Sequence, residues 1–324
     1  MQADTVTSPA PGRKMTLPVP AGFSFERTVV SHGWFDLAPF RWDPDTKVLT
    51  RTLRLEDGGN VVARIRHDGL LHVTLRSQAP LARAGINQAR RQIARLLRLD
   101  EDLDAFYTMV RVIDAPDLRW TAAFNAGRLM RSPTVFEDLV KMICTTNCTW
   151  ALTKVMVTAL VERLGEPASG GLRSFPTPAS MARRPEAFYR NVVRAGYRGA
   201  ALRGLARDVA GGRLDVEAWI DPSRPTELIR KEILSVHGAG PYVADNMLKL
   251  LGRYDGLGID SWCRRKFSSM YHGGRSVSDR RIEKFYSRFG RYRGLALWCD
   301  ITRDWFEGET PLVTAREKFS TANY

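Results

Sequence analysis

"VHGAGPYVAD" (residues 236–245) is the stretch of sequence that decides the fold, because two glycines and a proline stand directly before an apolar helical pattern. Glycine enters left-handed backbone conformations without steric cost. Gly238 and Gly240 therefore let the chain turn back after an expected helix at about 226–235 and begin another at about 241–253. Such a turn exposes backbone N–H groups at a helix N-terminus, which bind a phosphate without reading a base. A plain turn between two helices explains the same glycines.

An aspartate follows this hairpin in "GLGIDSWCRRKF" (256–267). Gly256 and Gly258 predict a loop, and Asp260 stands directly before a predicted helix that begins at Ser261. One interpretation is an N-cap that accepts a backbone hydrogen bond. The other is catalytic, because cleavage of an N-glycosidic bond leaves an oxocarbenium-like sugar, and a fixed carboxylate stabilises that charge or orients the attacking water. The two interpretations are compatible.

The charge balance narrows the class of partner. The chain of 324 residues has 49 Lys and Arg against 35 Asp and Glu, which gives a net charge of +14. A surplus of this size favours a polyanionic partner, most often nucleic acid, although a merely basic soluble protein has the same balance. No apolar stretch is long enough to span a membrane, and the first residues lack the hydrophobic segment of a signal peptide. We therefore expect no membrane partner and a cytoplasmic location, associated with the nucleoid in a bacterium.

The predicted fold class is α+β and mostly α, with a small antiparallel-sheet domain followed by a large helical part. Residues 1–22 are expected to form a flexible Pro-rich tail, and residues 23 to about 77 alternate with the period of strands, separated by Gly-rich turns. Ser132 and Pro133 start a helix, with Thr134 and Glu137 as its capping box. Further helices are expected at about 178–193, 198–210, 226–235, 241–253, 261–270, 278–289 and 294–306.

The hairpin followed by "GIDSW" (258–262) resembles the helix-hairpin-helix (HhH-GPD) superfamily of DNA glycosylases. "GRLMRSPTVFEDLVKMICTTN" (127–147) is similar to a helix entry of the 8-oxoguanine glycosylase branch, and "RAGYRGAAL" (194–202) is similar to its interrogation loop. The sheet is similar to the N-terminal domain that this branch shares with the AlkA-type 3-methyladenine glycosylases. The likeness implies four parts, which are the tail, a mixed α/β domain at 23–100, a central helical lobe at 119–233, and a helical lobe with the catalytic aspartate at 101–118 and 234–324.

The resemblance implies a monomeric, cofactor-free enzyme that flips a damaged base, expected to be a purine, out of double-stranded DNA and hydrolyses its N-glycosidic bond. Asp260 takes the catalytic position, and Gly238 and Gly240 take the phosphate-binding turn. It also implies a monovalent cation at backbone carbonyls of the hairpin, those of Leu234, Val236 and Ala239.

Three further residues match groups that enter the duplex. Tyr197 matches the side chain wedged into the stack after base flipping, and Asn147 and Arg198 match groups that contact the orphaned partner base. Tyr197 is otherwise a buried aromatic at a helix start, and Asn147 a hydrogen bonder inside a helix. Leu152 departs from the pattern, since the 8-oxoguanine branch has another arginine there, so strict pairing with cytosine does not follow.

The expected base pocket also departs from both branches. Asn246 and Ile301 stand where the 8-oxoguanine branch sandwiches the base between a cysteine and a phenylalanine. Trp298 and Trp262 supply stacking surfaces or pack in the core. The pocket therefore does not identify the lesion.

Tyr242 is the residue that separates hydrolysis from lyase chemistry. Lyase-competent members have a lysine in this first helical turn, and its amine forms a Schiff base with the sugar. A phenol cannot do so, which favours a monofunctional enzyme with Tyr242 as a pocket wall. Lys249, two turns further along the same face, is expected to lie too deep.

Metal chemistry has little support in the sequence. Cys144 and Cys148 lack the four-cysteine run of iron–sulfur glycosylases, and the histidines form no ligand pattern. No iron–sulfur cluster is therefore expected. Two alternative functions stay open, a bifunctional 8-oxoguanine-type glycosylase/AP lyase and a non-catalytic helix-hairpin-helix DNA-binding protein.

Overall fold

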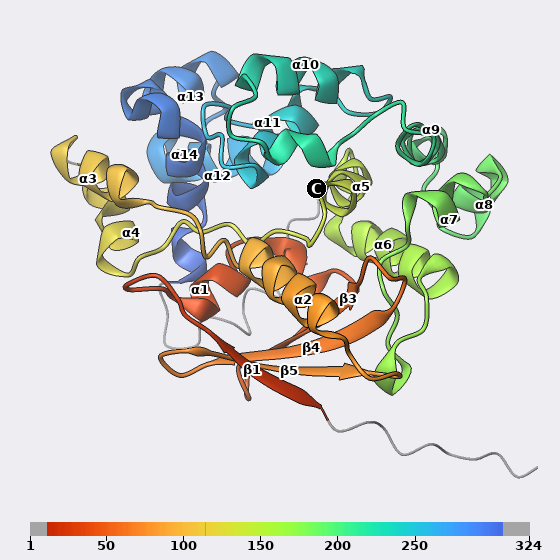
Figure 1. The fold of residues 1–324 in the computed structure, drawn as a ribbon. Helices are drawn as coiled ribbons and strands as arrows, with labels where there is room; N and C mark the ends of the chain where they lie inside the picture. The colour runs from red at the N-terminus through yellow and green to blue at the C-terminus, as the bar shows by residue number, and fades with distance from the viewer. Residues whose placement is uncertain (1–11, 114, 307–324) are drawn as a thin grey trace, which may run out of the picture.

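Five antiparallel strands form a sheet near the N-terminus of the computed structural model, which describes residues 12–113 and 115–306 (Figure 1). The spatial order is β1-β5-β4-β3-β2, so β2 to β5 are a meander and β1 is added beside its last strand. The strands are β1 Arg13–Leu17, β2 Phe40–Asp43, β3 Val48–Arg54, β4 Asn60–His67 and β5 Leu71–Ser77.

The alternating apolar positions of these strands form the core of the N-terminal domain. Leu53 stands opposite Val61, and Ile65 stands opposite Val73, with all four side chains buried. Helix α2 (Arg83–Leu96) packs over the sheet (Figure 1). Side chains at the period of a strand thus meet one helix face, as the sequence pattern predicts.

Strand β1 corrects part of the expectation that residues 1–22 form a flexible tail. Residues 13–17 pair with β5 in register, with Lys14 opposite Thr74 and Thr16 opposite His72. Only Leu17 in this strand is fully buried, so the apolar alternation that marks the other strands is almost absent. The free edge of β5 supplies backbone partners for the segment, a source of order that side-chain periodicity does not report. Residues 1–11 of the expected tail lie outside the described residues.

Most of the remaining described chain is helical, with loops and short 3-10 turns between the helices (Figure 1). The expected helices at 198–210 and 226–235 have the predicted bounds, whereas the helix expected at 178–193 is two short helices separated before Pro185, which cannot continue a helix. The helices after α1 (Phe25–Val29) and α2 are α3 Asp104–Val112, α4 Arg119–Ala123, α5 Val135–Thr145, α6 Trp150–Leu164, α7 Pro178–Ala182, α8 Glu186–Asn191, α9 Arg198–Ala210, α10 Thr226–Ser235, α11 Pro241–Leu250, α12 Ser261–His272, α13 Asp279–Tyr286 and α14 Arg293–Ile301.

The start of α5 joins the helical part to the sheet. Thr134 caps the helix by accepting from the backbone N–H of Glu137 at 3.2 Å, as predicted. The Glu137 side chain does not return the bond, so only half of the expected capping box forms. That carboxylate is buried instead against Arg51 of β3 and against Lys141, whose Nζ lies 2.7 Å away. A buried ion-pair cluster thus fixes α5 to the sheet.

No helix in the described part of the chain is long and apolar enough to cross a bilayer.

Candidate active site

The glycine hairpin joins α10 to α11 as predicted, but its two glycines serve different purposes. Gly238 has φ of 83°, and a Cβ there would lie 2.6 Å from the Cβ of Ala201. Gly240 has an ordinary φ of −85° and is the N-cap of α11, and a Cβ there would meet nothing within 4 Å. The turn therefore requires glycine at 238, whereas glycine at 240 leaves the helix N-terminus open to a close approach from outside.

The backbone of this turn is partly committed to its own structure. The carbonyl of Val236 accepts from the N–H of Ala239 at 2.9 Å. The side chains of Val236 and Ala239 are buried, while that of Leu234 is 40% exposed. A carbonyl has two lone pairs, so the Val236 oxygen retains one for a cation. The monovalent cation stays a prediction.

Asp260 is the N-cap of α12, because its Oδ1 accepts from the backbone N–H of Cys263 at 2.7 Å. The side chain is half-buried, so part of it faces solvent. Among the described residues no hydrogen-bond partner is seen for Oδ2. The capping interpretation is therefore correct, and it leaves one carboxylate oxygen for chemistry.

The loop that carries Asp260 is held by helix α11. The Nζ of Lys249 donates to the carbonyl of Leu257 at 2.6 Å, and Asp245 accepts from the N–H of Gly258 at 3.0 Å. Gly258 has φ of 62°, and a Cβ there would lie 2.6 Å from the Asn246 side chain. Because α11 begins at the glycine turn, one helix links the phosphate-binding candidate to the candidate catalytic carboxylate.

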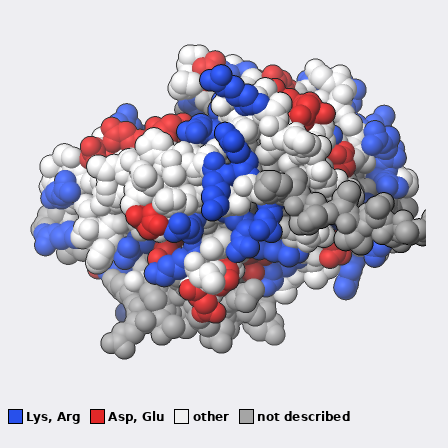
Figure 2. Space-filling view, turned by 60° about the horizontal axis from the view of Figure 1, so that its bottom comes forward, with Lys and Arg blue, Asp and Glu red and all other residues white. Residues whose placement is uncertain are grey.

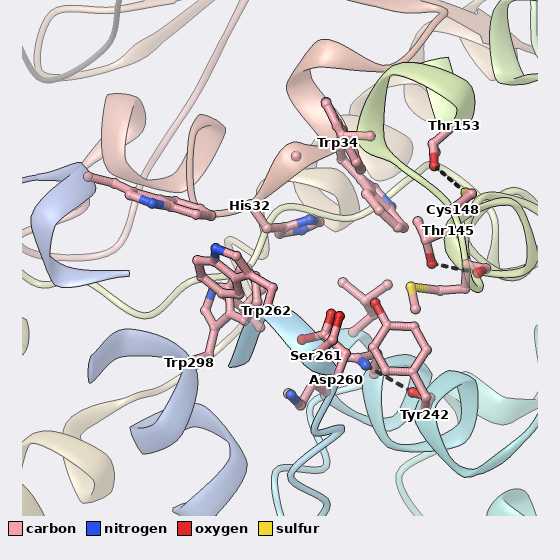
Figure 3. Close-up of a pocket in the computed structure, with 18 residues that line it drawn as sticks. His32, Trp34, Thr145, Cys148, Thr153, Tyr242, Asp260, Ser261, Trp262 and Trp298 are labelled. Carbon is pink, nitrogen blue, oxygen red and sulfur yellow. Dashed lines mark hydrogen bonds between the residues drawn. The ribbon is translucent and has the colours of Figure 1, made fainter. Parts of the chain in front are cut away.

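A cavity opens beside Asp260, at the junction of the N-terminal domain and several helices. Figure 3 shows Tyr242 and Asp260 on one side, with His32 and Trp34 across from them. Trp262 and Trp298 lie on one flank, and the other flank carries Thr145, Cys148 and Thr153 (Figure 3). The expected pocket residues Tyr242, Asn246 and Trp298 all line it.

Aromatic rings dominate the lining. Five of the eight tryptophans of the chain face this cavity, namely Trp34, Trp150, Trp262, Trp298 and Trp305. The ring centroids of Trp262 and Trp298 lie 6.1 Å apart, and each lies 5.8 Å from that of Trp305. Flat apolar faces of this kind suit a planar heterocycle. The interpretation of Trp298 and Trp262 as stacking surfaces therefore has structural support.

Hydrogen bonds fix the orientation of these rings. The indole N–H of Trp34 donates to Asp138 at 2.7 Å, and that of Trp298 donates to the carbonyl of Ser31 at 2.9 Å. A Cβ at Gly33 would lie 2.3 Å from the Trp150 ring, so this position admits only glycine while the ring stays in place. Ser31 and Gly33, on either side of His32, thus help to fix the aromatic rings on both sides of the cavity.

The position of Ile301 differs from the prediction that it lines the base pocket. Its side chain is buried in the hydrophobic core and does not line the cavity. The bulky indoles of Trp298 and Trp305 form the wall on this side instead. Residues that the sequence interpretation missed are His32, Trp34, Trp150 and Trp305. "HGWF" (32–35), an aromatic and glycine cluster without strand or helix period, is the signal that was available for the first two.

Three titratable groups in the cavity have shifted pKa values. Burial lowers the pKa of Lys249 to about 8 and that of His32 to about 4. Burial and the neighbouring Asp260 carboxylate raise the pKa of Tyr242 well above its usual value. At neutral pH the cavity therefore contains a mostly protonated amine, a neutral imidazole and an un-ionised phenol.

Tyr197 and Asn147 form a separate exposed group. The Tyr197 side chain is 63% exposed at the start of α9, so the buried-aromatic alternative is wrong. Asn147 follows the end of α5 with φ of 45°, which excludes the helix-interior alternative. Its Nδ2 donates to the Tyr197 hydroxyl at 3.3 Å. Both side chains thus project from neighbouring loops where a duplex can reach them.

Arg198 differs from its predicted role. Its guanidinium is buried, donates to the carbonyls of Thr146 and Asn147, and stacks 4.5 Å from the Tyr197 ring centroid. The left-handed turn at Asn147 leaves carbonyls without helical partners, and these take up the donors of Arg198. The expectation that Arg198 contacts the orphaned base is therefore corrected, because Arg198 positions the two exposed residues.

Metal-ligand clusters are not found in residues 12–113 and 115–306, where no group of three or more His, Cys, Asp or Glu could hold an ion. Cys148 Sγ lies 3.1 Å from the Cys144 carbonyl oxygen rather than pairing with its thiol.

On the face drawn in Figure 2, Lys and Arg side chains gather toward the middle, and Asp and Glu lie in smaller separate groups. The gathered Lys and Arg side chains suit a polyanionic partner.

Solved structures of DNA glycosylases share this fold. The 3-methyladenine DNA glycosylase from Archaeoglobus fulgidus matches with a TM-score of 0.71 at 18% identity, over 91% of this chain and 99% of that one. MBOgg1, in complex with a low affinity DNA ligand, matches at 0.66 and 20% identity over 91% and 96%. The Clostridium acetobutylicum 8-oxoguanine glycosylase/lyase, in complex with double-stranded DNA containing cytosine opposite 8-oxoG, matches at 0.63 and 20% identity over 87% and 92%.

No protein-family model matches the chain, and no curated protein matches its sequence. The structural likeness covers most of the chain at low identity, so it establishes the fold. The chain has the fold of the HhH-GPD DNA glycosylases, which confirms the fold expected from the hairpin.

Proposed function

We propose that the chain is a monofunctional DNA glycosylase that flips a damaged base, expected to be a purine, and hydrolyses its N-glycosidic bond. The observation that carries the proposal is Asp260, whose carboxylate lies at a helix N-terminus beside a cavity walled by five tryptophans. Capping of α12 occupies only Oδ1, and a protein that only binds DNA gains nothing from a second carboxylate oxygen next to an anionic ligand. The similar fold of known glycosylases supports the same assignment.

DNA would be held through its backbone and opened at one position. The N-terminus of α11, left open by Gly240, suits a phosphate. The exposed ring of Tyr197 suits the gap that a flipped base leaves in the stack, and Asn147 beside it offers an amide to the partner base. Arg198 holds both loops in this arrangement.

Chemistry would follow from the position of the carboxylate. With the base between the aromatic walls, the bond from the sugar C1′ to the base nitrogen breaks, and the base leaves with the bonding electrons. Oδ2 of Asp260 stabilises the positive charge that develops on the sugar, while Oδ1 stays bound to the N–H of Cys263. A water oxygen then bonds to C1′, and its proton passes by way of Asp260 to solvent or the departing base. The products are a free base and an intact abasic strand.

Tyr242 supports hydrolysis over lyase chemistry, because a phenol cannot form the iminium that strand cleavage requires. Its raised pKa keeps it un-ionised, so it acts as a neutral wall of the pocket. Its backbone carbonyl accepts from the Asn246 amide at 2.9 Å, which fixes the Asn246 side chain.

A glycosylase with lyase activity is a second candidate, and one observation favours it. Lys249 lines the same cavity as Asp260, and its lowered pKa leaves a fraction of neutral amine at physiological pH. Borohydride trapping on a lesion duplex decides between the two. We expect no covalent adduct with the wild type. A strong adduct that Lys249→Met abolishes would establish the lyase.

The proposed function is tested by free-base release from duplexes that each carry one defined lesion. Release of at least one base, with the abasic strand left uncut, supports it. Affinity for undamaged duplex should also fall by orders of magnitude between low and physiological salt, because several phosphates are neutralised. Salt-dependent binding without release from any duplex would favour the non-catalytic DNA-binding alternative. We further propose that the enzyme acts as a cytoplasmic monomer without a cofactor, with a monovalent cation at the hairpin carbonyls.

A further inference from the structure

Lys249 brings a positive charge into the aromatic cavity without a paired carboxylate. Its side chain is 3% exposed and lines the cavity. No acidic side chain among the described residues lies within ion-pair distance of its Nζ, and Asp245 and Asp260 act on it only from further away. An ammonium has three donors, and one of them reaches the carbonyl of Leu257. Within residues 12–113 and 115–306 no partner is seen for the other two N–H groups, which can therefore donate to an occupant of the cavity.

The Lys249 ammonium already occupies the place near an aromatic ring where a cationic ligand would bind. Rings of tryptophan attract cations over their faces, which makes an aromatic cavity suitable for positively charged alkylated bases. Here Nζ of Lys249 lies 5.9 Å from the ring centroid of Trp298. A base with its own positive charge would therefore enter beside a like charge in a site poor in water, where repulsion is strong.

His32 supplies a hydrogen-bond acceptor in the cavity, beside the donor at Lys249. Its Nε2 lies 2.5 Å from the carbonyl oxygen of Met130, which can only accept, so Nε2 carries the proton. The lowered pKa of His32 keeps the ring neutral, and Nδ1 is therefore an acceptor. The cavity offers an ammonium donor at Lys249 and a neutral acceptor at His32, which match a carbonyl oxygen and a ring N–H of an uncharged base.

We propose that Lys249 is a specificity-determining residue that excludes positively charged alkylated bases from this cavity and favours uncharged bases with a carbonyl oxygen. The inference rests on the proposed function, since it assumes that the cavity receives a flipped base. It goes further by assigning the choice of lesion to one side chain.

The test is Lys249→Gln, which removes the charge and retains a donor for Leu257. Release rates are compared for duplexes with N7-methylguanine, a cation, and with hypoxanthine, a neutral carbonyl base. We expect the ratio of cationic to neutral release to rise at least about tenfold in the variant relative to wild type. Lys284→Gln, on the exposed surface of α13, is the control and should leave the ratio unchanged. An unchanged ratio in Lys249→Gln overturns the proposal.

A second measurement does not depend on catalysis. Calorimetric titration of the free purines 9-methylguanine and 7,9-dimethylguaninium, in mildly acidic buffer, compares two ligands that differ by one methyl group and one charge. The wild type should prefer the neutral purine, and Lys249→Gln should reduce that preference about tenfold. If this shift occurs but no duplex loses a base, the specificity inference stands and the proposed glycosylase function fails. Equal preference in both proteins, with circular dichroism showing that both are folded, overturns the inference.

Discussion

The carboxylate of Asp245 accepts a hydrogen bond from the backbone N–H of Gly258 at 3.0 Å, and this bond ties the Asp260 loop to helix α11. Asp245 also forms an ion pair with Arg230 of α10. One side chain therefore connects both helices of the hairpin to the loop that presents the candidate catalytic group. A shift of the loop would move Asp260 relative to a bound sugar, whereas the cavity walls formed by His32, Trp34 and Trp298 belong to other segments and would stay in place.

Replacing Asp245 should consequently reduce the rate of base release more than lesion binding. We expect Asp245→Ala to lower kcat by about 10- to 100-fold, because small misplacements of a catalytic group are costly. Asp245→Asn retains an acceptor for Gly258 and loses the Arg230 charge pair, so it should lose less. Single-turnover kinetics and duplex affinity separate the two effects. Equal losses from Asn and Ala would assign the role to the ion pair rather than to the loop.

Asp260→Asn isolates the chemistry from the capping role. Asparagine is an N-cap as good as aspartate, so the free energy of unfolding should change by less than about 1 kcal/mol. Base release should fall by several orders of magnitude while lesion-duplex binding persists, because the charge acts mainly in the transition state. Asp57→Asn is a matched control, since Asp57 also accepts a backbone N–H, that of Gly59, but lies in a turn of the sheet. Near-normal turnover in Asp260→Asn would leave this residue as a cap alone.

Tyr197→Ala should weaken binding to a lesion duplex by roughly 1–3 kcal/mol, the contribution of base stacking on an aromatic ring. The loss of excision should be larger on duplex than on single strands, because a single strand has no stack to fill. Tyr197→Phe keeps the ring and removes only the hydroxyl that Asn147 contacts, so it should resemble wild type. Fluorescence anisotropy measures the loss of binding, and base-release assays on duplex and single-stranded substrates measure the loss of excision. Equal losses on duplex and single strand would exclude a wedge.

The hairpin and Asp260 were predictable because their signals are local. A left-handed glycine at 238 and a capping aspartate at 260 are set by their immediate neighbours in the chain. The cavity could not be predicted in the same way, because it depends on contacts between residues far apart in the sequence. Trp298 is oriented by the carbonyl of Ser31, and Gly33 is fitted to the ring of Trp150, relationships that no periodicity in one sequence reports.

The predictions for Arg198 and for residues 13–17, which form strand β1, were wrong for the same reason. Arginine beside an exposed tyrosine is typical of a DNA contact, but the carbonyls that bury Arg198 belong to a loop some fifty residues earlier, at Thr146 and Asn147. Residues 13–17 lack strand periodicity and gain order only from the edge of β5. Backbone groups that need partners decided both outcomes.

His32 should make the stability of the protein depend on pH. Its pKa is about 4 in the folded protein and near 6.5 when unfolded, so between these values the unfolded chain binds the extra proton. The free energy of unfolding therefore falls as pH drops from about 6.5 to 4, by up to about 3 kcal/mol from this group. The neighbouring charges of Lys141, Arg98 and Lys249 do not titrate in this range and oppose protonation throughout.

The part of this pH dependence that His32 contributes should be absent from a variant that keeps the same hydrogen bond. His32→Gln retains a donor for the Met130 carbonyl, so its loss of stability between neutral pH and about pH 4.5 should be smaller than that of wild type by on the order of 2 kcal/mol. Urea unfolding at the two pH values measures this difference. His237→Gln is the control for the loss of an imidazole, because His237 is exposed to solvent. The same acid loss in wild type and His32→Gln would show that this imidazole is not buried in its neutral form, and the acceptor at the cavity would then be lost with it.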